Sequence, residues 1–150
     1  MEDRPVVETV VQKNTADVVL GIIRGPGNTI LLSRKDASYT QWVLPGGPMR
    51  VEGGPKKNLI GIIEKRIGLL IQVPCITFAE YFEKLDYMIH VYNVEIPDWS
   101  SLPQKTLVNM KPFEKSYITE NKILLFEHHK IFEEVEQQYQ ERKLAHQYRR

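Results

Sequence analysis

Residues 42–69 read WVLPGGPMRVEGGPKKNLIGIIEKRIGL. The stretch opens with a short extended segment that Pro45 ends, and the pair Gly46-Gly47 follows directly. A loop with two further glycines then leads to residues 58–67, where apolar side chains recur at helical spacing, namely Leu59, Ile60, Ile63 and Ile67. This order predicts a strand, a tight turn, a loop and a short helix.

The segments on both sides of this stretch have the pattern of β-strands. Residues 16–24 are rich in β-branched side chains and run into Gly25-Pro26-Gly27-Asn28, which is typical of a turn between antiparallel strands. Residues 97–117 contain three prolines, so we expect them to be irregular except for one short strand near residues 106–110. The expected strands are residues 16–24, 29–34, 69–82 and 87–96.

The C-terminal segment predicts one long helix. Residues 119–145 contain neither glycine nor proline, and their apolar side chains recur at helical spacing. A helix of about 27 residues would be about 40 Å long, which exceeds the width of a domain of this size. Two interpretations stay open. Either the last turns fray on the surface, or residues 136–150 project as a helical tail and bind a protein partner or a second copy of the chain.

These elements and residues 42–47 resemble the Nudix hydrolase family, whose members include the MutT-like proteins. The family's signature, the Nudix box, is G-x5-E-x7-R-E-U-x-E-E-x-G-U, where U is a bulky aliphatic residue. Laid without a gap from Gly47, the box has its closing glycine at Gly68 and its aliphatic residues at Ile63 and Leu69. The resemblance covers about residues 14–135 and implies an α+β fold, an α/β/α sandwich. The box helix and the long C-terminal helix would pack on a mixed, curved sheet, in a single domain of residues 1–150.

The metal-binding residues of the Nudix box are replaced in this chain. The four glutamates of the pattern fall on Gly53, Ile62, Lys65 and Arg66, and its arginine falls on Gly61. In the family those glutamates hold the Mg²⁺ or Mn²⁺ ions that neutralise a diphosphate while water attacks it. Replacing two carboxylates by an ammonium and a guanidinium changes the local charge by about four units, which repels a dication. The resemblance and these replacements together predict no family-type metal site, no cofactor and no catalytic residue.

An active hydrolase is the alternative that other acidic residues leave open. Glu52 lies one residue before the first glutamate position, and Glu64 lies on the helix, about 100° away from Lys65. Further acids follow in the next strand and turn, at Glu80, Glu83 and Asp86. With Mg²⁺ or Mn²⁺, such a site would cleave a nucleoside diphosphate linked to another moiety. The simpler interpretation is that these acids are solvated surface residues.

Four cations are candidates for a phosphate site, namely Arg34, Arg50, Lys65 and Arg66. Arginine binds phosphate through a bidentate fork and lysine as a point charge, so the group would bind a nucleotide or RNA without activating water. The family that the chain resembles includes inactive members, which bind RNA or nucleotides or serve as scaffolds. The preferred prediction is therefore a catalytically degenerate Nudix domain that binds such a phosphate or a protein partner. The alternative that stays open is a purely structural subunit, in which these cations form a solvated, charged helix end without a ligand.

Composition excludes several other classes of protein. The chain has 150 residues, 20 Lys and Arg against 19 Asp and Glu, and a net charge of +1, so it is not a polycation that coats nucleic acid or acidic lipid. Its only cysteine, Cys75, cannot form an internal disulfide and is expected to be a buried core thiol. No apolar run approaches the roughly 20 residues of a membrane span, and the charged N-terminus does not resemble a secretory signal. We therefore expect an intracellular, cytoplasmic protein with no membrane contact.

Overall fold

The computed structural model describes residues 16–67, 75–96, 99 and 109–148. Its strands are β1 (Val18–Gly25), β2 (Thr29–Ser33), β3 (Gly46–Pro48), β4 (Ile76–Glu83), β5 (Met88–Glu95) and β6 (Met110–Glu114). A 3-10 turn, η1 (Pro26–Asn28), joins β1 to β2, and the helices are α2 (Gly54–Ile67), α3 (Lys115–Asn121) and α4 (Phe126–Tyr148). Runs of three strands thus alternate with one or two helices, an order typical of an α+β domain.

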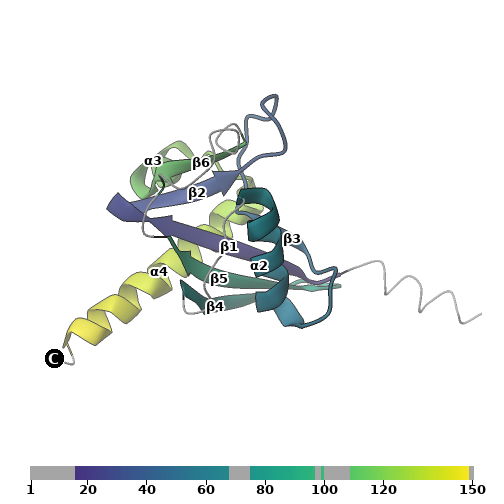
Figure 1. Ribbon diagram of the computed structural model, residues 1–150. Helices are drawn as coiled ribbons and strands as arrows, with labels where there is room; N and C mark the ends of the chain where they lie inside the picture. The colour runs from purple at the N-terminus through teal and green to yellow at the C-terminus, as the bar shows by residue number, and fades with distance from the viewer. Residues whose placement is uncertain (1–15, 68–74, 97–98, 100–108, 149–150) are drawn as a thin grey trace, which may run out of the picture.

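The strands form one mixed sheet with β1 at its centre. The strand order is β4-β5-β1-β2-β6, and β3 pairs with the first half of β1 (Figure 1). β1 runs parallel to β5, whereas all the other pairs are antiparallel. Gly46 lies opposite Leu20 with a φ of +152°, and a Cβ atom there would lie 2.0 Å from the carbonyl oxygen of Val19. The first glycine of the pair is therefore required for β3 to approach β1.

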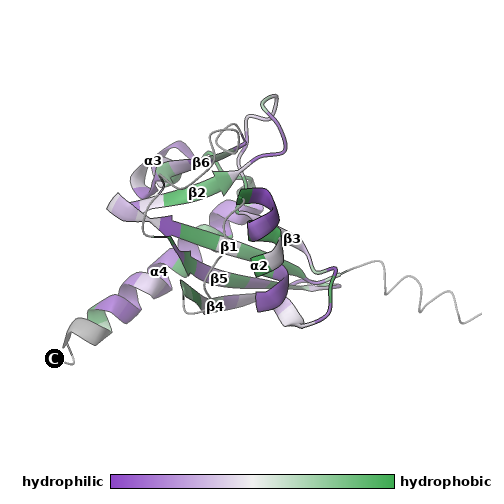
Figure 2. Ribbon diagram, in the orientation of Figure 1, coloured by the Kyte–Doolittle hydropathy of each residue, from purple (hydrophilic) through white to green (hydrophobic). Residues whose placement is uncertain are grey.

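Two apolar layers cover the two faces of the sheet. Successive residues of β1 point to opposite faces, so Val19 and Ile23 pack against α2, whereas Leu20 and Ile22 pack on the side of α4. Figure 1 shows α2 in front of the sheet and α4 behind it, and Figure 2 shows that the apolar residues concentrate in the central strands. The expected α/β/α sandwich is confirmed.

Most of the predicted elements of the first hundred residues are present. The strands β2 and β5 lie within the predicted ranges, β1 extends one residue beyond its range, to Gly25, and β4 covers Ile76–Glu83. Residues 69–74 of the predicted third strand, like the closing glycine of the box, Gly68, lie outside the described residues. The helix α2 begins at Gly54, four residues before the predicted start at residue 58. The short strand predicted near residues 106–110 lies further along the chain, because β6 pairs with β2 over Met110–Glu114, and the irregular chain predicted up to residue 117 is replaced by α3 from Lys115. Residues 97–98 and 100–108 of this prediction lie outside the described residues.

The predicted single helix at the C-terminus is two helices. Lys122 ends α3 in the left-handed conformation, with a φ of +47°, and its N–H donates to the carbonyl of Ile118. The chain then crosses the core, where Leu124 is buried and forms a bridge to Trp42, before α4 begins at Phe126. Burial of Leu124 beside Trp42 thus interrupts the helix without a glycine or proline. The C-terminal end of α4 extends beyond the sheet in Figure 1, and residues 140–145 are all exposed.

No helix in the described part of the chain is both long enough and apolar enough to cross a membrane.

Candidate functional site

The loop before α2 is fastened to the helix by one buried side chain. Asn58 is 4% exposed, and its Oδ1 accepts the N–H groups of Arg50 at 2.9 Å and Val51 at 3.0 Å. Its Nδ2 donates to the carbonyls of Val51 and Gly54, each at 2.8 Å. A polar residue directly before the apolar stripe, next to Leu59, was the only sequence signal for this role. The loop geometry therefore depends on Asn58 rather than on an acidic residue.

The loop also depends on glycine at position 53. Gly53 has a φ of +115°, and a Cβ atom there would lie 2.3 Å from Cδ of Lys57. L-residues rarely adopt this backbone conformation, so a side chain at this position is strained even where Lys57 rotates away.

One face of α2 lies against the glycine pair and the end of β2. Ile62 is half-buried, and its Cδ1 would lie 3.9 Å from a Cβ atom at Gly47. One turn later Arg66 Nη1 donates a hydrogen bond of 2.5 Å to the hydroxyl of Ser33, which is buried at the end of β2. Lys65 lies on the same side of the helix and is exposed. The structure therefore places Lys65 and Arg66 together at one edge of the sheet.

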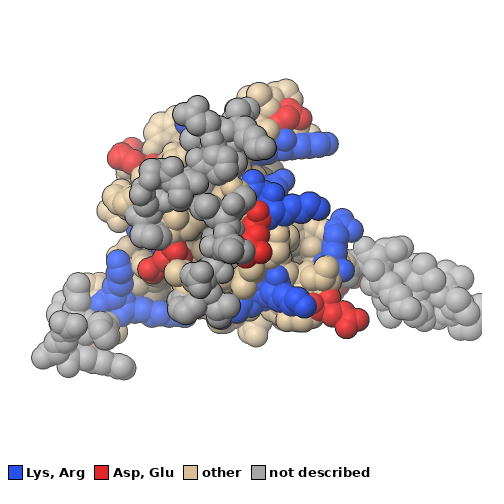
Figure 3. Space-filling view, viewed as in Figure 1, with Lys and Arg blue, Asp and Glu red and all other residues tan. Residues whose placement is uncertain are grey.

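The other two predicted phosphate ligands lie elsewhere. Arg34 follows Ser33 and has its guanidinium 4.5 Å from the centre of the Trp42 ring, which belongs to the apolar layer on the α4 side. Arg50 is exposed in the loop, and its N–H is bound by Asn58. Asn58, which binds the N–H of Arg50, lies eight residues before Arg66. This separation corresponds to about 12 Å along the axis of α2, so the backbone of Arg50 is held far from Arg66. Figure 3 shows Lys and Arg side chains spread along the side of the molecule that carries α2, with acidic side chains between them. Phosphate binding by any of the four residues stays a prediction.

The extended segment before the glycine pair is held by α4 and by the chain that leads into it. The N–H of Trp42 donates to the carbonyl of Ile123, and the carbonyl of Trp42 accepts the N–H of Leu125. The N–H of Leu44 donates to Nδ1 of His128 at 3.0 Å. Burial lowers the pKa of His128, and the nearby Glu127 partly offsets that effect. His128 is therefore a neutral hydrogen-bond acceptor, a role that sequence reasoning did not assign.

Solved structures with the same arrangement of strands and helices belong to MutT and Nudix proteins. The MutT protein from Methanosarcina mazei Go1 matches with a TM-score of 0.63 and 16% identity, over 83% of this chain and 94% of that one. A mutT/nudix family protein from Listeria innocua matches with a TM-score of 0.65 and 15% identity, over 87% of this chain and 99% of that one. The chain has the Nudix fold. The C-terminal domain of mouse MUTYH, solved in complex with human PCNA, matches with a TM-score of 0.62 and 12% identity, over 82% of this chain and 88% of that one. No family model and no curated protein matches the sequence.

The residues at the Nudix box positions do not fit a divalent metal ion. Mg²⁺ and Mn²⁺ prefer carboxylate, carbonyl and water oxygens. The face of α2 that would supply carboxylates in the Nudix pattern instead presents the hydrocarbon of Ile62 and the cations of Lys65 and Arg66. Gly53, at the remaining position, has no side chain. No metal-dependent step can be derived through these residues.

The alternative acidic residues do not meet at this face. Glu52 is exposed in the loop, and Glu64 is half-buried on α2, two residues after Ile62 and one before Lys65. Glu80 Oε2 accepts a hydrogen bond of 2.6 Å from Gln138 of α4, so this acid points to the opposite side of the sheet from α2. Within the described residues, no group of three or more His, Cys, Asp or Glu side chains is placed to hold a metal ion.

Proposed function

We propose that this chain is a non-hydrolysing Nudix-fold domain that binds the phosphate of a nucleotide or RNA at Lys65 and Arg66. The hydrogen bond from Arg66 to Ser33 is the observation that supports the proposal most directly. It holds a guanidinium at the edge of the sheet beside the exposed ammonium of Lys65. A guanidinium carries five N–H donors, and Ser33 accepts from one of them, so donors remain for a phosphate oxygen.

The fixed position of Arg66 favours binding of an anion. A side chain that is already ordered loses less conformational entropy when a ligand arrives. Because Lys65 and Arg66 are successive residues of one helix, both move with α2 and hold a constant relative position. An ordered guanidinium and a nearby ammonium together match a phosphate group better than scattered surface lysines do.

The same charges oppose hydrolysis by the metal-dependent route. At roughly 5 Å and an effective dielectric constant of about 20, each unit of charge on a metal ion would be repelled by one cation by about 3 kcal/mol. Water activation therefore has no support at this face, whereas direct binding of a phosphate has.

A binding experiment with two charge-reversal double variants tests the proposal. Affinities for ADP-ribose, ADP and a short capped RNA are measured by fluorescence competition for the wild-type chain and for Lys65→Glu/Arg66→Glu. We expect the double variant to lose at least about tenfold in affinity, because two charged contacts become repulsive. Lys130→Glu/Arg142→Glu reverses two exposed charges on α4 and should bind as the wild type does. Equal affinities for all three proteins would refute the proposal.

A turnover assay separates binding from catalysis. The same ligands are incubated with Mg²⁺ and with Mn²⁺, and the products are separated chromatographically. We expect intact ligands. Turnover that Glu52→Gln or Glu64→Gln abolishes would instead establish a hydrolase with a non-standard metal site. If no ligand is bound and none is turned over, the remaining function is that of a structural subunit.

A further inference from the structure

A cavity lies at the other end of the central strands from Ser33, on the side of the sheet away from α2. It has a volume of about 460 Å³ and is lined by the β1–β2 hairpin, the start of α3 and the second half of α4. This volume is within the range of small-molecule sites in proteins, about 300–1,000 Å³. The side chains on which the inference depends are Arg24, Ile30, Cys75, Lys115, Tyr139 and Lys143. None of them belongs to the α2 face described above.

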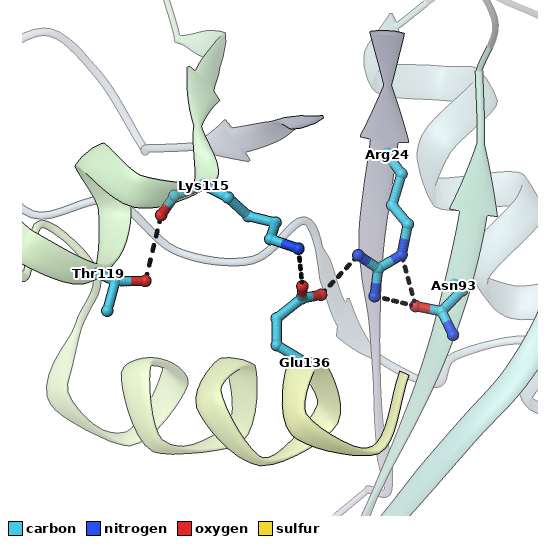
Figure 4. Close-up of polar contacts among 5 residues, drawn as sticks. All are labelled: Arg24, Asn93, Lys115, Thr119 and Glu136. Carbon is cyan, nitrogen blue, oxygen red and sulfur yellow. Dashed lines mark hydrogen bonds and ion pairs between the residues drawn. The ribbon is translucent and has the colours of Figure 1, made fainter. Parts of the chain in front are cut away.

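A buried ion-pair network fixes the floor of this cavity (Figure 4). Arg24 is 9% exposed, and its Nε and Nη2 donate to Oδ1 of Asn93 at 3.0 and 2.7 Å. Arg24 Nη1 pairs with Glu136 at 2.5 Å, and the second oxygen of Glu136 pairs with Lys115 Nζ at 2.7 Å. The network joins β1, β5, α3 and α4, so the cationic groups are held in place before any ligand binds.

Tyr139 contributes an aromatic ring to the cavity, and two cations lie close to it. The guanidinium of Arg24 lies 3.7 Å from the centre of the Tyr139 ring, and Lys143 Nζ lies 5.0 Å from it. Among the described carboxylates, none lies within ion-pair distance of Lys143. Its ammonium is therefore available to an anion that enters the cavity.

The charges and the apolar wall together define the ligand. Three cations, Arg24, Lys115 and Lys143, meet two carboxylates, those of Glu95 and Glu136, so the cavity is net positive. Lys115 has three N–H donors, of which Glu136 accepts one, and Lys143 faces the same space. Two ammonium groups suit the dianion of a phosphate monoester. The ring of Tyr139 and the side chain of Ile30 suit a flat, weakly polar group beside it.

We propose that this cavity binds a phosphate monoester of the size of a nucleoside monophosphate. The phosphate lies between Lys115 and Lys143, and the ring of the ligand lies against Tyr139. This site is independent of the proposed phosphate site at Lys65 and Arg66, from which the sheet separates it.

The single cysteine of the chain reports directly on occupancy. Cys75 is half-buried and lines the cavity, so the prediction of a buried core thiol is wrong. Alkylation of Cys75 by iodoacetamide is followed by mass spectrometry on the full chain, with increasing AMP, GMP, CMP, UMP or inorganic phosphate. We expect at least one nucleoside monophosphate to slow alkylation in a saturable manner, with inorganic phosphate weaker by about tenfold because it lacks the ring contact. Calorimetric titration of the same ligands gives an affinity that does not depend on the thiol.

Three variants locate the binding. Lys143→Glu changes an exposed residue and should weaken binding and protection by at least about tenfold. Lys130→Glu, on another face of α4, should leave both unchanged. Lys65→Glu/Arg66→Glu should leave the protection of Cys75 unchanged, because those two residues lie on the other side of the sheet from the cavity. The inference is overturned if no nucleoside monophosphate gives heat or protection at millimolar concentration, or if inorganic phosphate binds as well as every nucleotide. It is equally overturned if Lys143→Glu binds as the wild type does. It is overturned as well if Lys65→Glu/Arg66→Glu, and not Lys143→Glu, abolishes the protection of Cys75.

Discussion

Nδ1 of His128, in α4, accepts a hydrogen bond of 3.0 Å from the backbone N–H of Leu44. This contact ties the C-terminal helix to the segment that positions the glycine pair and, through β3, the loop before α2. An imidazole nitrogen accepts a hydrogen bond only when it carries no proton. Burial, which lowers the pKa of His128 below its ordinary value of 6.5, and the hydrogen bond therefore favour the same neutral state.

Stability should consequently fall in mild acid. Below the ordinary pKa of 6.5 the unfolded chain binds a proton at His128 that the folded chain resists, so acid favours unfolding until the lower folded-state pKa is reached. The expected slope from this residue is up to about 1.4 kcal/mol per pH unit. The control is His128→Asn, whose amide oxygen is an acceptor that does not titrate. We compare urea unfolding of this variant and of the wild type at about pH 7.5 and about pH 5.5. Identical pH dependence in the two proteins would show that His128 does not control it.

Restoring a glutamate at the first box position should destabilise the fold. Gly53→Glu and Gly53→Ala both place a side chain at a φ of +115°, which should cost about 1–3 kcal/mol in the free energy of unfolding. Gly27→Ala has a φ of +69° with no atom within 4 Å of the added Cβ, so it should cost less, about 1–2 kcal/mol. Gly61→Ala, exposed in α2 with open space around it, should stabilise by about 1 kcal/mol. Chemical denaturation ranks the four variants, and a neutral Gly53→Ala would mean that the loop is not held in this conformation.

The sequence predicted the fold well where local chemistry determines the structure. The hairpin follows from β-branched residues around Gly25-Pro26-Gly27-Asn28, and α2 follows from its apolar spacing. The spacing of Ile62, Lys65 and Arg66 likewise placed them on one face. The start of α2 was missed because its first turn contains Gly54, Pro55 and two lysines, and is held by Asn58 rather than by apolar residues.

Other features depend on contacts between distant segments. Lys122 ends α3 because Leu124 is drawn into the core beside Trp42, and nothing in the residues around Lys122 signals this. Arg34 lies against Trp42 because successive residues at the end of a strand point to opposite faces, so that only Ser33 meets Arg66. The ion-pair network of Arg24 joins residues of four elements, and a sequence without an alignment carries no signal for such a cluster.

Asn58 should control the mobility of the loop that carries Arg50. Asn58→Ala removes four hydrogen bonds and leaves the N–H groups of Arg50 and Val51 without this acceptor, so we expect a loss of about 2–4 kcal/mol. Asn58→Asp keeps the acceptor and loses the two donated bonds, so it should fall between the wild type and Asn58→Ala. Amide hydrogen exchange of residues 50–54 follows the loop itself, and unfolding in urea follows the whole domain. Unchanged exchange in Asn58→Ala would contradict the proposed fastening.

Glu136 should be the most sensitive charged residue of α4. Its side chain is 12% exposed and pairs with both Arg24 and Lys115, so Glu136→Gln leaves two cations without their counter-charge. Breaking a buried pair in this way costs about 3–5 kcal/mol, whereas Glu134→Gln, on the exposed side of the same helix, should change stability by less than about 0.5 kcal/mol. The double variant Arg24→Met/Glu136→Leu replaces both ions of the shorter pair. It should recover part of the loss, because the desolvation penalties of two buried charges are removed together. Urea unfolding gives the three values. Similar costs for Glu136→Gln and Glu134→Gln would mean that α4 is held to the sheet by its apolar residues alone.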